Sequence, residues 1–170
     1  MIDEPVLGHE FGAFEATASQ DPATLECIQA LIREEPFAVL CTQGGGQPYG
    51  SVVAFAFDPD MGSFVFATPV ATRKFRLLSE CDRVALVVDN RGRYPEDMMR
   101  VGAVTVTGQA EQLESGPKFE AGAMLLTSRH PHLARFVQAP STALFRVRVF
   151  RYLYVTRFQE VRQWLPAARG

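Results

Sequence analysis

Hydrophobic and polar residues alternate in short runs along most of the chain, a pattern typical of strands whose two faces meet different surroundings. Six such runs, rich in Val, Phe, Ala and Thr, follow Pro36: residues 37–42, 51–57, 63–68, 84–89, 102–109 and 144–156. Turn residues separate the first three runs, with three consecutive glycines in segment 43–48 and Pro59 with Gly62 in segment 58–62. Both segments are short enough for hairpins, so the pattern predicts a mostly antiparallel β-barrel.

Helical spacing interrupts this pattern in three places. Asp21 is a predicted N-cap with Pro22 at the first helical position, and apolar residues then recur at helical spacing until Pro36 ends the pattern. Shorter helices are predicted at 72–78 and 118–127. No repeat or linker divides the chain, so we expect a single domain over 1–170. Its parts are an arm at 1–20, a helix at 21–35 and the barrel with its inserted helices at 36–160.

Charge and composition exclude several functions. Lys and Arg number 17 against 19 Asp and Glu, so the net charge of −2 gives no support for a general nucleic-acid or polybasic membrane surface. No apolar run approaches the roughly 20 residues that cross a bilayer. The first residues, Met1 to Glu4, are acidic, unlike those of a signal peptide. The sequence therefore predicts a cytoplasmic protein without nucleic-acid or membrane partners.

Cysteine and histidine spacing favours no metal site. Cys27, Cys41 and Cys81 form no C-x-x-C pair, and we expect each to be a small core residue. His130 and His132 flank Pro131 without nearby Cys, Asp or Glu, which favours a loop over a metal site.

The most informative segment runs from the third predicted strand into the following helix. Thr68 ends the strand, Thr72 is a plausible N-cap, and Arg73 and Lys74 occupy the first helical turn. The helix dipole disfavours cations there by about 0.3 to 1 kcal/mol each, and a bound phosphate would remove the conflict. The alternative is that both cations are simply solvated on a surface helix.

The preceding strand adds a second feature. Alternate positions of 50–57 separate a large face, with Val53, Phe55 and Phe57, from a face of smaller side chains. The smaller positions are Gly50, Val52, Ala54 and Ala56. Such a face lets a flat ligand approach the backbone closely, or it accommodates a packed helix.

In this order, the residues over roughly 35–114 resemble the FMN-binding split-barrel family typified by pyridoxamine 5′-phosphate oxidase. Segments 81–84 and 108–113 resemble the family's entry to the fourth strand and a later strand ending. The resemblance implies a mainly β fold, a six-stranded antiparallel split barrel of Greek-key type, and FMN as cofactor. The implied cofactor-binding residues are Gly50, Ser51, Val52, Val53, Ala67, Thr68, Thr72, Arg73 and Lys74.

The resemblance also implies a homodimer with FMN at the subunit interface. The apolar run 144–156 and the tail 164–166 offer more hydrophobic surface than a small barrel needs inside, which is compatible with a dimer. Loop 90–97, with its Arg-Gly-Arg sequence, is either solvated or reaches the neighbouring subunit's cofactor.

Departures from the oxidase pattern leave the substrate open. Phe55 stands where the family's oxidases carry a substrate-phosphate cation, Ala103 stands near the position of a flavin-contacting Gln, and 155–166 lacks the closing Arg-x-His. We therefore expect an FMN-dependent oxidoreductase of unknown small substrate rather than a vitamin B6 oxidase. No catalytic residue stands out, although Tyr94, Arg129 and His130 lie where relatives place substrate contacts.

Binding modules of the same fold are the alternatives. They are a non-catalytic FMN carrier or electron-transfer protein, a deazaflavin-binding protein, and a haem-binding protein. The absence of histidine after His132 opposes axial haem ligation from the tail.

Overall fold

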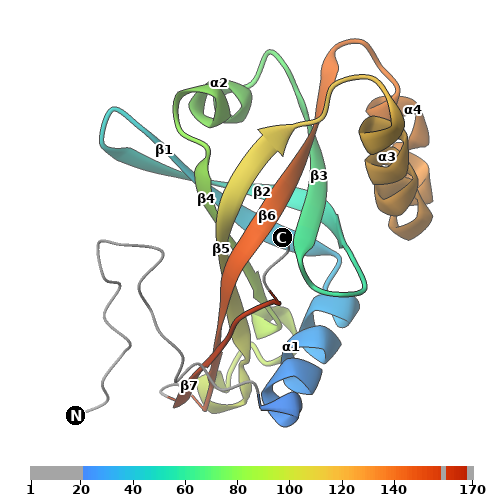
Figure 1. Cartoon of the computed structure of the whole chain (residues 1–170). Helices are drawn as coiled ribbons and strands as arrows, with labels where there is room; N and C mark the ends of the chain where they lie inside the picture. Colours follow the sequence, from blue (N-terminus) through green and yellow to red (C-terminus); the bar gives the residue numbers. More distant parts are fainter. Residues whose placement is uncertain (1–20, 158–159, 168–170) are drawn as a thin grey trace.

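A computed structural model describes residues 21–157 and 160–167 (Figure 1). The predicted arm at 1–20 lies outside the described residues. The strands are β1 (Phe37–Gly44), β2 (Gln47–Phe57), β3 (Ser63–Pro69), β4 (Arg83–Asp89), β5 (Ala103–Gln112), β6 (Thr142–Thr156) and β7 (Glu160–Trp164).

The strands form an antiparallel barrel in the order β3-β2-β1-β4-β5-β6, closed by pairing of β3 with β6. β7 is added to the outer edge of β6. Strands β4, β1, β2 and β3 follow one another across the sheet in the Greek-key arrangement. The prediction of a six-stranded antiparallel barrel is confirmed, and β7 is the strand that the sequence pattern missed.

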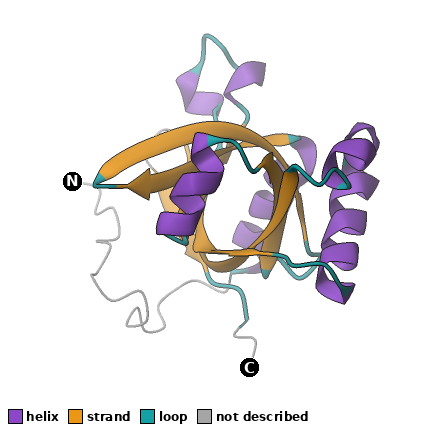
Figure 2. Cartoon of the chain, turned by 90° about the horizontal axis from the view of Figure 1, so that it is seen from above, coloured by secondary structure: helices purple, strands orange, loops and turns teal. Residues whose placement is uncertain are grey.

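Helices close the two ends of the barrel. α1 (Pro22–Glu34) is capped by the Asp21 carboxylate, which accepts from the N–H groups of Ala23 and Thr24, and its Ile28 and Ile32 enter the barrel core. α2 (Arg73–Glu80) covers the opposite end, where Phe75 and Leu78 pack on the same core. Seen from above, the strands form a ring with α2 over its near end (Figure 2).

A second helical unit packs outside the barrel. α3 (Pro117–Arg129) and α4 (Ala134–Val137) cover the outer faces of β2, β3 and β6. Leu126 and Val137 meet Val65 and Leu144 there in a smaller apolar cluster separate from the barrel interior. Short 3₁₀ turns occupy 91–93, 98–100 and 131–133.

The alternation predicted for β2 is confirmed. Val53 and Phe55 point into the barrel core, whereas Val52 on the opposite face is 68% exposed. Ala56 belongs to the cluster beneath α3. The face of small residues therefore serves two purposes, since its far end receives a helix and its near end, at Gly50 and Val52, is open.

Two expectations are corrected. Cys27 is exposed, and Cys41 and Cys81 are only half-buried, because Cys41 lies on the outward face of β1 and neither of the others enters the core. Trp164 does not supply surplus surface for a partner, because it is buried against the ring of Tyr152, with centroids 5.5 Å apart. Within the described residues, no helix combines the length and apolar character needed to cross a membrane.

The barrel is split between β2 and β3. β3 pairs with β6 along its whole length, from Ser63 to Pro69, but with β2 only through Phe55, Ala56 and Phe57. The rest of β2 pairs with β1 alone. Every second residue of this segment therefore directs its backbone N–H and C=O groups into the gap rather than into a ladder.

Substitution of Gly108 tests the close approach of β5 and β6 in the barrel. Gly108 lies at a register shift between β5 and β6, and a Cβ atom there would collide with the backbone carbonyl of Arg148. Gly108→Ala should lower the free energy of unfolding by about 2 kcal/mol, because backbone cannot yield as a flexible side chain does. Urea denaturation measures this, with Gly92→Ala as the matched control, since a Cβ at Gly92 meets open space. Equal stabilities of the two variants would contradict the packing described.

Candidate functional site

The corner between β3 and α2 brings two hydroxyl groups together. Thr68 is fully buried at the end of β3, and its Oγ1 lies 3.1 Å from Oγ1 of Thr72. Thr72 is the N-cap of α2, since its Oγ1 accepts from the N–H of Phe75 at 3.2 Å. The predicted cap is thus confirmed, and the N–H groups of Arg73 and Lys74 in the first turn have no acceptor within the helix.

The protons of these hydroxyls are already committed. Thr72 donates its single proton to the carbonyl of Pro69 at 2.8 Å, so the proton between the two threonines must come from Thr68. An oxyanion arriving at this corner would accept from Thr68 after rotation of one hydroxyl group. This exchange replaces one hydrogen bond by a stronger, charge-assisted one.

Two cations flank the same corner. The guanidinium carbon of Arg73 lies 5.1 Å from the centroid of the Tyr49 ring, which places the start of α2 beside β2. Lys74 is half-buried, and loss of hydration lowers the pKa of its ammonium group. A nearby anion would offset this loss, because opposite charge favours the ionised form.

The open edge of β2 forms the other wall of the gap. Gly50 and Val52 are exposed on its outer face, and Ser51 and Val53 lie on the inner face. Ser51 Oγ is buried without a hydrogen-bond partner among the described residues. A buried hydroxyl without a partner is uncommon in native structures, so Ser51 is a candidate to bind a polar group or an ordered water in the gap.

The predicted site residues fall into two groups. Thr68, Thr72, Arg73 and Lys74 surround one corner, and Ser51 faces the inside of the split. Ala67 packs in the cluster beneath α3, so only its backbone faces the gap, and the side chain of Val53 belongs to the core. Tyr49 was missed, although its position two residues before Ser51 on the same strand face was the available signal.

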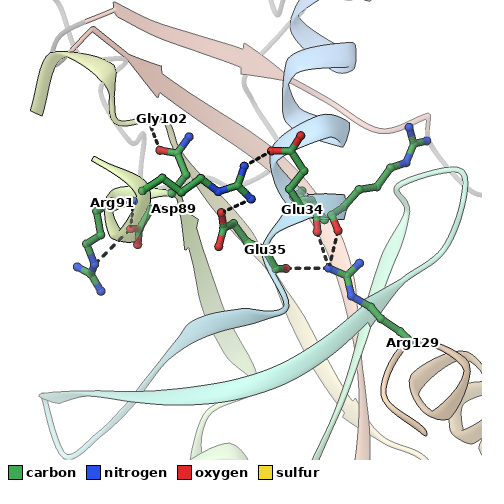
Figure 3. Close-up of polar contacts among 10 residues, drawn as sticks. Glu34, Glu35, Asp89, Arg91, Gly102 and Arg129 are labelled. Atoms are coloured by element: carbon green, nitrogen blue, oxygen red, sulfur yellow. Dashed lines mark hydrogen bonds and ion pairs between the residues drawn. The ribbon is translucent and has the colours of Figure 1, made fainter. Parts of the chain in front are cut away.

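The end of α3 is occupied by structural contacts. The Arg129 guanidinium donates to the carbonyls of Ile32 and Glu35 at 2.7 Å each, at the C-terminal end of α1 (Figure 3). His130 is 4% exposed, and its Nε2 lies 2.9 Å from the carbonyl oxygen of Phe55. Both residues therefore make structural contacts within the chain, and their expected role as substrate contacts stays a prediction. Among the described residues, no three His, Cys, Asp or Glu side chains are grouped to hold a metal.

The loop after β4 is likewise anchored within its own subunit. Arg93 forms ion pairs with Glu34 at 2.7 Å and Glu35 at 2.9 Å, and Arg91 pairs with Asp89 at 3.2 Å (Figure 3). Tyr94 stacks beneath the guanidinium of Arg100. The Arg-Gly-Arg sequence therefore ties the loop to α1 and β4.

Comparison with known proteins gives the family. The sequence profile of pyridoxamine 5′-phosphate oxidase matches residues 24–156. The chain belongs to the pyridoxamine 5′-phosphate oxidase family. Among curated proteins, no individual sequence matches this family member.

Solved structures share the fold of this pyridoxamine 5′-phosphate oxidase family member at low sequence identity. A haem-binding protein from Mycobacterium smegmatis has a TM-score of 0.70 at 17% identity, over 79% of this chain and 55% of that one. The present chain thus spans about half of that protein. A FAD-binding protein from Mesorhizobium loti has a TM-score of 0.62 at 19% identity, over 77% of this chain and 90% of that one. A protein from Clostridium acetobutylicum that is related to general stress protein 26, of the pyridoxinephosphate oxidase family, has a TM-score of 0.66 at 14% identity. The match covers 84% of this chain and 94% of that one.

His130 makes the stability of this family member depend on pH. Burial lowers the pKa of His130, because the charged ring would lose its hydration. The unfolded chain, with a pKa of about 6.5, then takes up a proton that the native state resists. The free energy of unfolding should therefore fall as the pH drops from about 7 to about 5, by at most about 1.4 kcal/mol per pH unit.

Chemical denaturation across this pH range measures the effect. His130→Gln should flatten the slope, and the exposed neighbour variant His132→Gln should not. A slope that survives in His130→Gln would show that other groups cause it. The pKa of the Asp21 carboxyl is lowered by its hydrogen bonds, so this group changes charge below the pH range of the experiment and does not contribute to the slope.

Proposed function

We propose that this protein is an FMN-binding flavoprotein that acts as an oxidoreductase on a small substrate. The observation that carries the proposal is the corner where Thr68 and Thr72 hydroxyls lie 3.1 Å apart beside Arg73 and Lys74. Family membership and the FAD-binding structural neighbour support it.

The corner fits a phosphate monoester in charge and in donor geometry. Arg73 offers a planar fork of donors, Lys74 a point charge, and Thr68 a rotatable hydroxyl. The first-turn N–H groups of α2 add donors aligned with the helix dipole. Together they turn the unfavourable placement of two cations at a helix start into a favourable one.

The open segment of β2 would receive the flat ring system. Bound FMN would supply hydride or electron transfer at its ring. The chain's contribution would be positional, since alternate backbone groups of 50–53 face the gap and the Ser51 hydroxyl lacks a partner among the described residues. Tyr49, whose ring centroid is 5.1 Å from the guanidinium carbon of Arg73, connects this strand to the corner. The residues identified at this site include no histidine or carboxylate, so protein groups here bind and orient rather than transfer protons.

We propose that the working form is a homodimer built on the outward face of β1, β2, β4, β5 and β6. The strand register places uncharged outward residues side by side across this face. They are Val39, Cys41, Val52, Ala54, Ala85, Val87, Ala103, Thr105, Thr107, Leu153 and Val155. This face borders the open edge of β2, so a second copy seated on it would cover the cofactor ring.

Haem binding is the second candidate, favoured by the Mycobacterium smegmatis neighbour. His130 is unsuited as a ligand, because it is buried and its Nε2 contacts the Phe55 carbonyl. Titration with haem separates the candidates, since specific ligation gives a stoichiometric shifted Soret band.

Removing the charges of Arg73 and Lys74 should abolish the preference for FMN over riboflavin, which lacks the phosphate. For Arg73→Gln/Lys74→Gln we expect the FMN dissociation constant to rise by about 100-fold or more, since each charge-assisted contact contributes about 1.5 to 3 kcal/mol. Riboflavin, which lacks the phosphate, should bind wild type and variant equally. Flavin fluorescence quenching measures both ligands.

Arg76→Gln is the matched control, because Arg76 lies on the same helix, is paired with Glu80, and points its largely exposed side chain to solvent. It should leave the FMN affinity unchanged. An unchanged FMN affinity in the double variant, or equal losses for FMN and riboflavin, would refute the assignment of this corner to the phosphate.

A charge on the outward face should separate the subunits. Val52→Glu places two like charges at or near the proposed interface, and we expect the dimer dissociation constant to rise at least about tenfold, equal to about 1.4 kcal/mol. Met124→Glu is the control, since Met124 on α3 is also 68% exposed but lies on another face. Sedimentation velocity measures the change. A monomeric wild type, or equal dissociation of both variants, would contradict this interface.

A further inference from the structure

A cavity lined mostly by polar and charged residues lies at the other end of β3. Its volume is about 450 Å³, within the range of small-molecule sites, and its lining includes Ser63, Asp82, Gln109, Glu111, Arg146 and Arg148. Ser63 begins β3 and Thr68 nearly ends it, so the cavity is about 17 Å from the proposed flavin phosphate corner along the strand. The two sites are separate.

Two arginines project from β6 into this cavity. Arg146 and Arg148 flank buried Val147, so they share the outward face of the strand, beside Glu111 and Gln109 of β5. Residues at this spacing lie about 7 Å apart, close enough for both guanidinium groups to reach one small anion.

Within the described part of the chain, Arg146 has no partner for its charge. Its Nε atom is buried and unbonded, and among the described residues the side chain forms neither an ion pair nor a hydrogen bond. Desolvating a guanidinium N–H without an acceptor costs about 1 to 3 kcal/mol or more, so such groups are rare unless a ligand completes them.

Arg148 is held in place by a relay of hydrogen bonds. Its Nη2 donates to Oε1 of Gln109 at 2.9 Å, and Nε2 of Gln109 donates to Oδ2 of Asp82 at 2.6 Å. The guanidinium carbon also lies 5.2 Å from the ring centroid of Phe150. These contacts use one edge of the guanidinium group and leave its other donors for a ligand.

The acidic residues of the cavity have cations of their own outside it. Asp82 lies 3.9 Å from Arg83, and Glu111 lies 3.9 Å from Lys118. Among the residues that the structure describes, neither Arg146 nor Arg148 forms an ion pair with these carboxylates.

We propose that this cavity binds a small phosphate ester, held between the guanidinium groups of Arg146 and Arg148. A phosphate monoester carries about two negative charges at neutral pH and presents three terminal oxygens, which suit two planar donor groups. The proposal does not depend on flavin binding, because it uses no residue of the β3–α2 corner.

The test uses inorganic phosphate with the full chain in the Arg73→Gln/Lys74→Gln background, which removes the other proposed phosphate site. Titration at constant ionic strength should shift the Arg146 Nε–H resonance in ¹H–¹⁵N spectra with saturation. Adding Arg146→Gln should raise the phosphate dissociation constant at least about tenfold. Arg135→Gln, a change of an exposed arginine on α4, should leave it unchanged.

The proposal is overturned if chloride at the same ionic strength gives the same shift, or if Arg146→Gln and Arg135→Gln bind phosphate equally. Thermal unfolding without phosphate gives an independent check. Because Nε of Arg146 is buried without a partner, Arg146→Gln should not lower Tm, whereas phosphate should raise Tm in its Arg146-containing parent and not in the variant. A lower Tm without phosphate, with no difference in phosphate response, would assign Arg146 a structural role and refute the site.

Discussion

The pairing of β3 determines the architecture around it. β3 stays with β6 over its full length but leaves β2 after Phe55, Ala56 and Phe57. A barrel whose ladders all had equal length would satisfy every backbone group internally and leave no edge. Here, the long ladder of β3 with β6 closes the barrel, whereas its short ladder with β2 leaves one gap. The chain turns at Pro69, so that α2 begins at the mouth of that gap. The candidate cofactor site exists because of this inequality.

Much of this arrangement could be predicted from local physics. The Thr72 cap followed from a hydroxyl at the strand-to-helix bend, and the two faces of β2 followed from the alternation of large and small residues. These features depend on neighbours in sequence, so a single chain displays them. The pairing of β3 with β6 that closes the barrel could not be read from the local pattern, since 72 residues separate the two strands.

Other features could not be read from the sequence because they depend on distant partners. The Arg-Gly-Arg sequence gave no sign that Arg93 pairs with Glu34 and Glu35, and Arg129 gave none of its bonds to α1. β7 was missed because only a short segment separates it from β6 and its residues are mostly polar. The cysteines were misplaced because residue type alone predicts burial only on average, while strand register decides which face each one occupies.

The Arg129 contact has a consequence for how the chain folds. Its acceptors, Ile32 and Glu35, precede it by 97 and 94 residues. During synthesis α1 emerges first, yet the side chain that binds its terminal carbonyls emerges only after the first five barrel strands. The C-terminal end of α1 is therefore completed only by a long-range contact, and contacts of this kind form slowly because a long loop must close first.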